Sequence, residues 1–175
     1  MGGMIAVNDD ELAESLRETR FYTGAILDPN SAWLLRRSLH TFPLRMREHV
    51  RITKLLQNHL HSRSEVKKVY VANTDTEQMS DYGGILFFEL ASHVMDSYSQ
   101  FSRALSLFDT GTGMACVSSM VAQPWSGSHA SLAPEEKIAM GLTEGLIRLS
   151  FGLEHPDDLI ADLDQAFHAL SPAYA

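Results

Sequence analysis

The sequence predicts an α+β fold, in which a small sheet is covered by helices on one side in a two-layer arrangement. Residues 146–153 alternate as in a strand with one buried face, which holds Ile147, Leu149, Phe151 and Leu153. Residues 85–90 are apolar except for Glu89, which is typical of a strand buried on both faces. After Pro156, apolar side chains recur at helical spacing up to Leu170, which indicates a helix that covers the sheet.

The first sixty residues are predicted to begin with a short strand and to continue as helices. Residues 1–7 are short and apolar, and Asn8 then starts a helix with three acids in its first turn, where the helix dipole favours negative charge. The turn 28–31 opens another helix, which Pro43 should end or kink. A further helix runs through Met46, Val50, Leu56 and Leu60, with Arg45, Arg47 and Arg51 pointing outward. A solvated basic face is a more ordinary explanation of these arginines than an anion site.

The central residues are predicted to add strands and helices in turn. Residues 66–71 have the composition of a strand, and the polar residues 73–82 form a loop before the strand 85–90. Between Val94 and Phe108, apolar and aromatic side chains recur at three- and four-residue steps, which predicts one helix, with a further strand near Phe108. Pro134 and the acids behind it begin a short helix before the strand 146–153.

Composition and charge restrict the class of protein. The 175 residues include 14 basic and 22 acidic side chains, a net charge of −8, which argues against nucleic acid as a main partner. No apolar run reaches membrane length and no signal pattern is visible at the amino terminus, so no membrane partner is expected. The single Cys116 fits a cytoplasmic location, and its apolar neighbours favour a buried, inert thiol. The eight histidines show no zinc spacing, so no metal is expected.

Arg148 is the only charged residue inside the alternating strand. A guanidinium on a strand face is either a solvated surface residue or a clamp for an anion, and residue type alone favours the solvated alternative. A planar fork with a fixed charge is nevertheless the best side chain for holding a carboxylate. The glycines at 111 and 113 resemble a phosphate loop only superficially, because no Gly-Lys-Ser/Thr or third glycine follows them.

Two segments give the chain a resemblance to a known family. Residues 145–154 (Gly-Leu-Ile-Arg-Leu-Ser-Phe-Gly-Leu-Glu) and the following 157–163 resemble the carboxy-terminal signature of the Cys/Met-metabolism pyridoxal-phosphate enzymes. These enzymes include cystathionine γ-synthase, cystathionine γ-lyase, methionine γ-lyase and the O-acylhomoserine sulfhydrylases. Residues 32–46 are similar to the long interdomain helical segment of that family. The resemblance extends over nearly the whole chain.

The resemblance implies the small domain of a fold-type I pyridoxal-phosphate enzyme, with a mostly antiparallel sheet preceded by a long kinked interdomain helix. It implies that residues 1–60 are the end of the large-domain region with the interdomain helices, and that residues 61–175 are the carboxy-terminal small domain. The helix around Trp33 and Leu34 is more apolar than one small sheet can cover, which predicts exposed surface where the large domain would pack.

The resemblance also implies a substrate-binding role for Arg148, which matches the strand arginine that binds the α-carboxylate of the amino-acid substrate in the family. Gly113 stands where the family usually has the serine of a Ser-Leu-Gly-Gly segment, and Met114 stands where it has the leucine. Ala115 and Cys116 replace the two glycines. These departures remove a hydroxyl and leave a role for the backbone N–H groups open.

A second loop supplies the last residue of the implied substrate site. Residues 123–129 correspond to the family segment His-Pro-Ala-Ser-Met-Thr-His, in which Ser128 replaces the threonine and keeps its hydroxyl. The neighbouring His129 is interpreted as structural, because a lone histidine in a loop is more often structural than catalytic. The implied substrate-binding set is therefore Arg148, Gly113, Met114 and Ser128, with no catalytic residue among them.

The resemblance implies pyridoxal 5'-phosphate as the cofactor of the complete enzyme and a sulfur-containing amino acid as its substrate. The family's Schiff-base lysine precedes the Gly-Gly segment at residues 2–3, and the four lysines present stand in a different setting: Lys54, Lys67, Lys68 and Lys137. The chain is therefore expected to bind no cofactor covalently, to be inactive alone, and to need a large cofactor-binding domain and homo-oligomer partners. The alternatives are a stand-alone, non-catalytic binding or interaction module derived from that domain, and a truncated product without activity.

Overall fold

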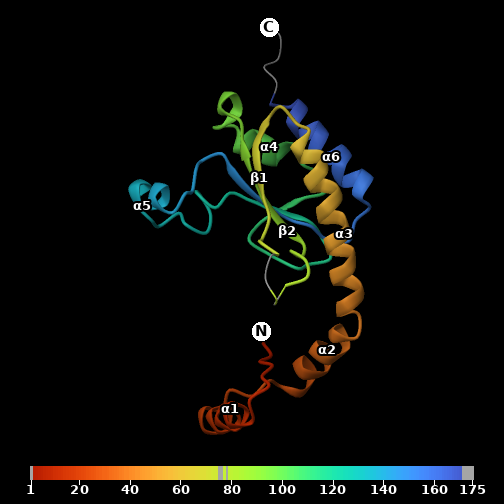
Figure 1. Ribbon diagram of the computed structural model, residues 1–175, viewed down its shortest axis with the longest axis vertical. Coiled ribbons are helices and arrows are strands. Elements are labelled where there is room, and N and C mark those ends of the chain that lie inside the picture. The colour runs from red at the N-terminus through yellow and green to blue at the C-terminus, as the bar shows by residue number, and fades with distance from the viewer. Residues whose placement is uncertain (1, 75–76, 78, 171–175) are drawn as a thin grey trace. The chain divides into compact units, whose positions relative to one another are not determined.

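The computed structural model describes residues 2–74, 77 and 79–170, and it contains two compact units, Met1–Leu44 and Arg45–Ala175 (Figure 1). The long helix α3 (Phe42–His61) contributes Ile52, Leu56 and Leu60 to the hydrophobic core of the second unit. The division at residue 60 that the sequence suggested concerns the domains of a complete enzyme, and it remains a prediction.

Two capped helices make up most of the first unit. Helix α1 (Asp10–Thr23) is capped by Asp9, whose Oδ1 accepts a hydrogen bond from the Leu12 amide at 2.7 Å, and it ends at Gly24 with a φ of 68°. Helix α2 (Pro29–Leu39) is capped by Asp28, which accepts a hydrogen bond from the Ser31 amide at 3.1 Å. The N-cap of the helix predicted to start at Asn8 is therefore one residue later, at Asp9, and the turn at 28–31 opens a helix as expected.

The strand predicted for residues 1–7 is wrong for residues 2–7, and Met1 lies outside the described residues. Residues 2–7 adopt no regular secondary structure, and the side chains of Met4 and Ile5 are exposed. A strand needs a neighbour that takes its backbone hydrogen bonds, and an apolar sequence by itself does not supply one. Helices α1 and α2 contain no buried residue either.

Within the described residues, the second unit is built on a five-stranded sheet with the order β1-β2-β5-β4-β3. The strands are β1 (Val66–Tyr70), β2 (Ile85–Leu90), β3 (Asp109–Thr110), β4 (Met120–Ala122) and β5 (Leu146–Ser150). Neighbouring strands are antiparallel except for β3 and β4, which are parallel. The edge strand β1 has a register shift against β2 between Val66 and Lys68. The predicted small, mostly antiparallel sheet is confirmed.

The core lies between the sheet and the helices α3, α4 (Tyr98–Ala104) and α6 (Pro156–His168), of which α3 and α6 lie side by side (Figure 1). The register pairs Leu86 with Leu149 and Phe88 with Ile147, so these four side chains share one face and are fully buried. The Phe88 ring meets Phe101 of α4 and Phe167 of α6 at centroid distances of 5.9 and 6.0 Å. The predicted two-layer arrangement is therefore confirmed.

The single helix predicted between Val94 and Phe108 is replaced by a short 3₁₀ turn, η1 (Ser92–Val94), and the helix α4. After α4 the backbone becomes extended at Leu105, and the buried Asp162 carboxylate accepts hydrogen bonds from the amides of Ser106 and Leu107 at 2.8 and 2.9 Å. An acid 55 residues later in the chain thus takes two donors that a continued helix would need for itself. The short helix predicted at Pro134 is confirmed as α5 (Pro134–Ala139).

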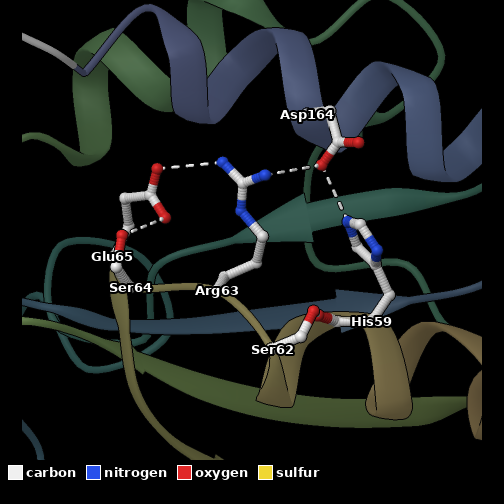
Figure 2. Close-up of polar contacts among 6 residues, drawn as sticks. All are labelled: His59, Ser62, Arg63, Ser64, Glu65 and Asp164. Carbon is white, nitrogen blue, oxygen red and sulfur yellow. Dashed lines mark hydrogen bonds and ion pairs between the residues drawn. The ribbon is translucent and has the colours of Figure 1, made fainter.

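A polar network fastens the end of α3 to α6 and to the start of β1 (Figure 2). The Arg63 guanidinium donates to Asp164 Oδ1 at 3.2 Å and to Glu65 Oε1 at 2.9 Å. His59 Nε2 lies 2.7 Å from the same Asp164 oxygen. Arg63 also lies over the Phe167 ring, 5.1 Å from its centroid, so the network rests on the edge of the core.

Candidate functional site

Strand β5 places Arg148 on the sheet face opposite to the core. Its neighbours in the strand, Ile147 and Leu149, are fully buried on the core face, so alternation sends Arg148 to the other side. Its direct cross-strand partners are Phe87 in β2 and Ala122 in β4, because β5 lies between these two strands. A residue in the middle of a sheet is held more rigidly than one on a loop, which suits a binding site.

The guanidinium of Arg148 is partly buried and only partly hydrogen-bonded. Its Nη2 donates to the backbone carbonyls of Gly111 and Gly113 at 3.3 and 3.2 Å. Its Nε is buried and has no hydrogen-bond partner within the described part of the chain. A buried donor of a charged group is costly to leave unpaired, so this geometry favours an anion that accepts from the remaining N–H groups.

The structure brings together two of the four residues that the resemblance singled out, Arg148 and Gly113. Met114 follows on an exposed part of the same loop, and its carbonyl accepts from the Cys116 thiol with an S···O distance of 3.6 Å. Ser128 is exposed, and its Oγ lies 2.9 Å from Nδ1 of the neighbouring His129. The substrate-binding roles of all four residues remain proposals.

Cys116 was predicted to be a buried thiol, and this prediction is wrong, because its side chain is exposed. The loop that carries it also has an unusual backbone, since Ala115 adopts a positive φ of 55°. A left-handed conformation is normally taken by glycine, and a residue with a Cβ atom is strained there. The resemblance places a glycine of the family's segment at this position, and glycine adopts such a φ without strain.

The Met120 side chain occupies the space beside Gly113. A Cβ atom at Gly113 would lie 2.2 Å from the Met120 sulfur, which is far inside van der Waals contact. A serine at position 113 would therefore require the flexible Met120 side chain to move.

The ammonium groups of the four lysines each face an acid or an aromatic ring. A Schiff-base lysine must reach its neutral form, which desolvation or a nearby cation promotes. The Lys54 ammonium instead pairs with Asp81 at 2.6 Å, and this hydrogen bond raises the pKa of Lys54. Lys67 Nζ lies 3.1 Å from Glu89 Oε1. Lys68 Nζ lies 4.6 Å from the centroid of the Tyr70 ring, and Lys137 Nζ lies 4.8 Å from the centroid of the Trp125 ring.

The described residues contain neither a cluster of metal-binding side chains nor a membrane-spanning helix. No group of three or more histidine, cysteine or acidic side chains is arranged there to hold a metal ion. No helix in that part of the chain is both long enough and apolar enough to cross a membrane.

Sequence reasoning missed the residues that hold the Gly111–Gly113 loop in place. Ser119 is fully buried and is hydrogen-bonded to Glu154, which comes four residues after the end of β5. Glu154 directly follows the predicted strand 146–153, and an acid in that place was a signal that could have drawn attention to it. Its partner could not have been found from spacing, because 35 residues separate the two.

Solved structures with a similar fold include two enzymes in complex with amino acids. Cystathionine γ-lyase from Lactobacillus plantarum, complexed with L-serine, is 27% identical with a TM-score of 0.84, over 94% of this chain and 45% of that chain. Cystathionine γ-synthase from Xanthomonas oryzae pv. oryzae, complexed with cystathionine, is 28% identical with a TM-score of 0.84, over 94% and 44%. The fold is therefore that of fold-type I pyridoxal-phosphate-dependent enzymes.

The family model for Cys/Met metabolism PLP-dependent enzymes matches residues 1–168, and the chain belongs to this family. L-methionine γ-lyase of Fusobacterium nucleatum subsp. nucleatum is 32% identical over 95% of this chain and 44% of its own length. Cystathionine β-lyase of Bacillus subtilis is 32% identical over 98% of this chain and 46% of its own length. The chain thus spans less than half the length of these curated relatives.

Proposed function

We propose that this chain is the carboxy-terminal portion of a pyridoxal-phosphate-dependent sulfur amino-acid enzyme of the trans-sulfuration, γ-lyase or γ-synthase type. Its contribution is the clamp for the substrate α-carboxylate, with Arg148 as the clamp and Gly113, Met114 and Ser128 on the loops beside the substrate. The family membership supports pyridoxal phosphate as the cofactor of the complete enzyme, and the names of the relatives support a sulfur-containing amino acid as substrate.

The observation that carries the proposal is the partly satisfied guanidinium of Arg148. Two backbone carbonyls hold Nη2, while Nε is buried without a partner in the described residues. A carboxylate is planar, carries one negative charge and has two accepting oxygens, so it matches the N–H groups that remain. A guanidinium that is fixed in place holds the α-carboxylate and so fixes the position of the substrate α-carbon. A fixed reacting group favours the reaction.

We propose that the cofactor is held by a different part of the complete enzyme. The four lysine ammonium groups of this chain face acids or aromatic rings, which supports the absence of a Schiff-base lysine here. The electron sink for the reaction would then come from a large cofactor-binding domain, and this chain alone would be inactive. Homo-oligomer partners are part of the same proposal.

A second candidate is a stand-alone, non-catalytic binding or interaction module derived from this domain. The changes at Gly113, Ala115 and Cys116 and the setting of the lysines support it. Purification from the native source separates the two candidates: the enzyme portion must be continuous with, or associated with, a polypeptide that carries a pyridoxal-phosphate lysine. Isolation of the chain with other proteins and without such a polypeptide would favour the module.

The clamp is tested by substrate affinity in the complete, cofactor-loaded enzyme. The ligand is whichever of L-methionine, cystathionine and L-serine the wild-type enzyme binds most tightly by calorimetry. Arg148→Lys keeps the charge and loses the planar fork, so we expect the affinity to fall at least about tenfold, which corresponds to about 1.4 kcal/mol. Arg103→Lys in α4 is the matched control and should change the affinity less than about twofold.

Equal, small effects of the two lysine substitutions would show that Arg148 is an ordinary strand residue. Failure of the wild-type enzyme to bind any of the three amino acids would refute the proposed substrate class.

A further inference from the structure

A buried polar network lies where the loop that holds Arg148 meets the end of β5. The Ser119 amide donates to Glu154 Oε1 at 2.7 Å, and the Ser119 hydroxyl donates to Glu154 Oε2 at 2.8 Å. The carboxylate therefore accepts from both donors of one fully buried residue. Hydrogen bonds to an ionised acceptor are shorter and stronger than those between neutral groups, so this pair is a firm attachment.

Gly152 completes the attachment from the side of β5. Its amide donates to the Ser119 hydroxyl oxygen at 2.9 Å. A Cβ atom at Gly152 would lie 2.3 Å from the Val117 carbonyl oxygen and 2.6 Å from the Ser118 carbonyl carbon, so the loop backbone rests directly on this glycine. The Leu153 amide adds a hydrogen bond to the Val117 carbonyl at 2.9 Å.

His49 joins α3 to the same place. Its side chain is 1% exposed, and its Nδ1 lies 3.1 Å from the Gly152 carbonyl oxygen. Since a carbonyl can only accept, Nδ1 carries the proton in this contact. The other ring nitrogen, Nε2, is buried and has no partner among the described residues.

The network reaches Arg148 through the two short strands. Ser119 comes directly before β4, and its carbonyl accepts from the Asp109 amide at the start of β3 at 3.0 Å. The Gly111 amide donates to the Val121 carbonyl of β4 at 3.0 Å. The position of Ser119 thus sets where Gly111 lies, and the Gly111 carbonyl in turn accepts from the Arg148 guanidinium.

We infer that Glu154 is a positioning residue for the carboxylate clamp, acting through Ser119 on the loop whose Gly111 and Gly113 carbonyls hold Arg148. The inference rests on the proposed function of Arg148. Without the Glu154 carboxylate, two buried donors of Ser119 lose their acceptor, and the loop keeps the Gly152–Ser119 and Leu153–Val117 hydrogen bonds but loses its link to a charged group. The guanidinium then keeps its charge and loses its fixed direction.

The test uses the complete, cofactor-loaded enzyme and the same amino-acid ligand as above. Glu154→Ala should weaken binding about tenfold, because a misplaced binding group loses affinity steeply with distance. Glu154→Gln should recover part of the loss, since its amide oxygen still accepts from the Ser119 amide. Ser119→Ala, which removes one link and leaves the carboxylate, gives a second variant in case the first does not fold.

The control for a merely structural effect is Val94→Ala, a core truncation in η1 outside the network. The unfolding temperature of every variant is measured alongside its affinity. Binding that falls with Glu154→Ala and Ser119→Ala and stays within about twofold of wild type with Val94→Ala supports the positioning role. Affinity that only tracks the unfolding temperature, or an unchanged affinity in both network variants, overturns it.

The two proposals fail separately. If Arg148→Lys weakens binding and the network variants do not, only the positioning role is refuted. If Arg148→Lys has no effect, the clamp itself is refuted, whatever Glu154 does.

Discussion

Ala115 has a backbone conformation that is unfavourable for a residue with a Cβ atom. Its φ of 55° lies in the left-handed region, where a Cβ atom causes strain and glycine does not. We predict that Ala115→Gly raises the free energy of unfolding by about 0.5–1 kcal/mol, because the relief of strain exceeds the entropy that glycine adds to the unfolded chain. Urea unfolding measures the change.

The control for Ala115→Gly is Ala104→Gly at the last residue of α4, where the backbone is helical. Glycine lowers stability in a helix, so the two substitutions should have opposite signs. Destabilisation by both would mean that the backbone at residue 115 does not hold a positive φ in solution.

The lysines lead to a second prediction at the scale of single residues. With pyridoxal phosphate at a stoichiometric concentration and borohydride reduction, we expect no lysine of the isolated chain to be labelled in full. Lys54 illustrates the reason, since its hydrogen bond to Asp81 raises the pKa of its ammonium group and disfavours the reactive amine. Peptide mass mapping gives the measurement. Full labelling at one position would show that this chain carries its own cofactor lysine.

Arg148 could be found from the sequence because two independent signals meet on it. Alternation along the strand predicted that Arg148 lies on the face opposite to the core. The family resemblance implied that this arginine binds the substrate carboxylate. The contact between Ser119 and Glu154 could not be found, because it depends on how two strand ends meet in three dimensions. The exposure of Cys116 was missed for a related reason, since apolar neighbours in the sequence do not bury a loop that the described residues leave exposed.

At the scale of elements, the strands β2 and β5 and the helix α6 were predictable because their apolar periodicity agrees with their tertiary environment. The prediction of a helix up to Phe108 was wrong because Asp162 accepts hydrogen bonds from the amides that follow α4. The spacing of apolar residues contains no information about an acid so far away in the sequence. The strand predicted at residues 2–7 failed because pairing is a property of two segments.

The polar network between α3, β1 and α6 makes stability depend on pH through Glu65. Burial by itself would raise the pKa of this carboxyl, but hydrogen bonds from its own backbone and from Arg63 outweigh burial and hold the pKa below its usual 4.5. A carboxyl that is more acidic in the folded state stabilises the fold above about pH 4.5. That contribution is lost as the pH falls through the folded-state pKa.

We therefore predict that Glu65→Gln reduces the loss of unfolding free energy between pH 6 and pH 3 by up to about 1 kcal/mol. Urea unfolding at several pH values measures the slope. Glu14→Gln is the control, since Glu14 pairs with Arg17 on the exposed surface of α1. If the free energy of unfolding depends on pH equally in wild type and Glu65→Gln, Glu65 does not contribute to the pH dependence.

At the scale of the whole molecule, the two units differ in how much apolar surface they cover. The first unit leaves Phe21, Tyr22 and Trp33 exposed by 75%, 82% and 62%, whereas the second buries a continuous core. The predicted exposure around Trp33 and Leu34 is confirmed. A large domain of the complete enzyme as the cover for this surface remains a proposal.

Amide hydrogen exchange in the full chain tests the difference between the units. Helices without buried residues open easily, so the amides of α1 and α2 should exchange orders of magnitude faster than those of the buried part of α3 and of α6. Equal protection would mean that a second copy of the chain covers the first unit in solution. Repeating the measurement over a range of protein concentrations identifies that case.

The register shift and the two lysines of β1 bear on how the molecule can assemble. An unpaired strand edge is a template on which another chain can add a strand, and this edge carries Lys67 and Lys68 beside an irregular step in its hydrogen-bonding pattern. A copied strand would have to bring like charges together and match a bent partner. Fibril growth by strand pairing at the β1 edge is therefore disfavoured. Association on this side of the sheet would have to use contacts between side chains instead of backbone hydrogen bonds.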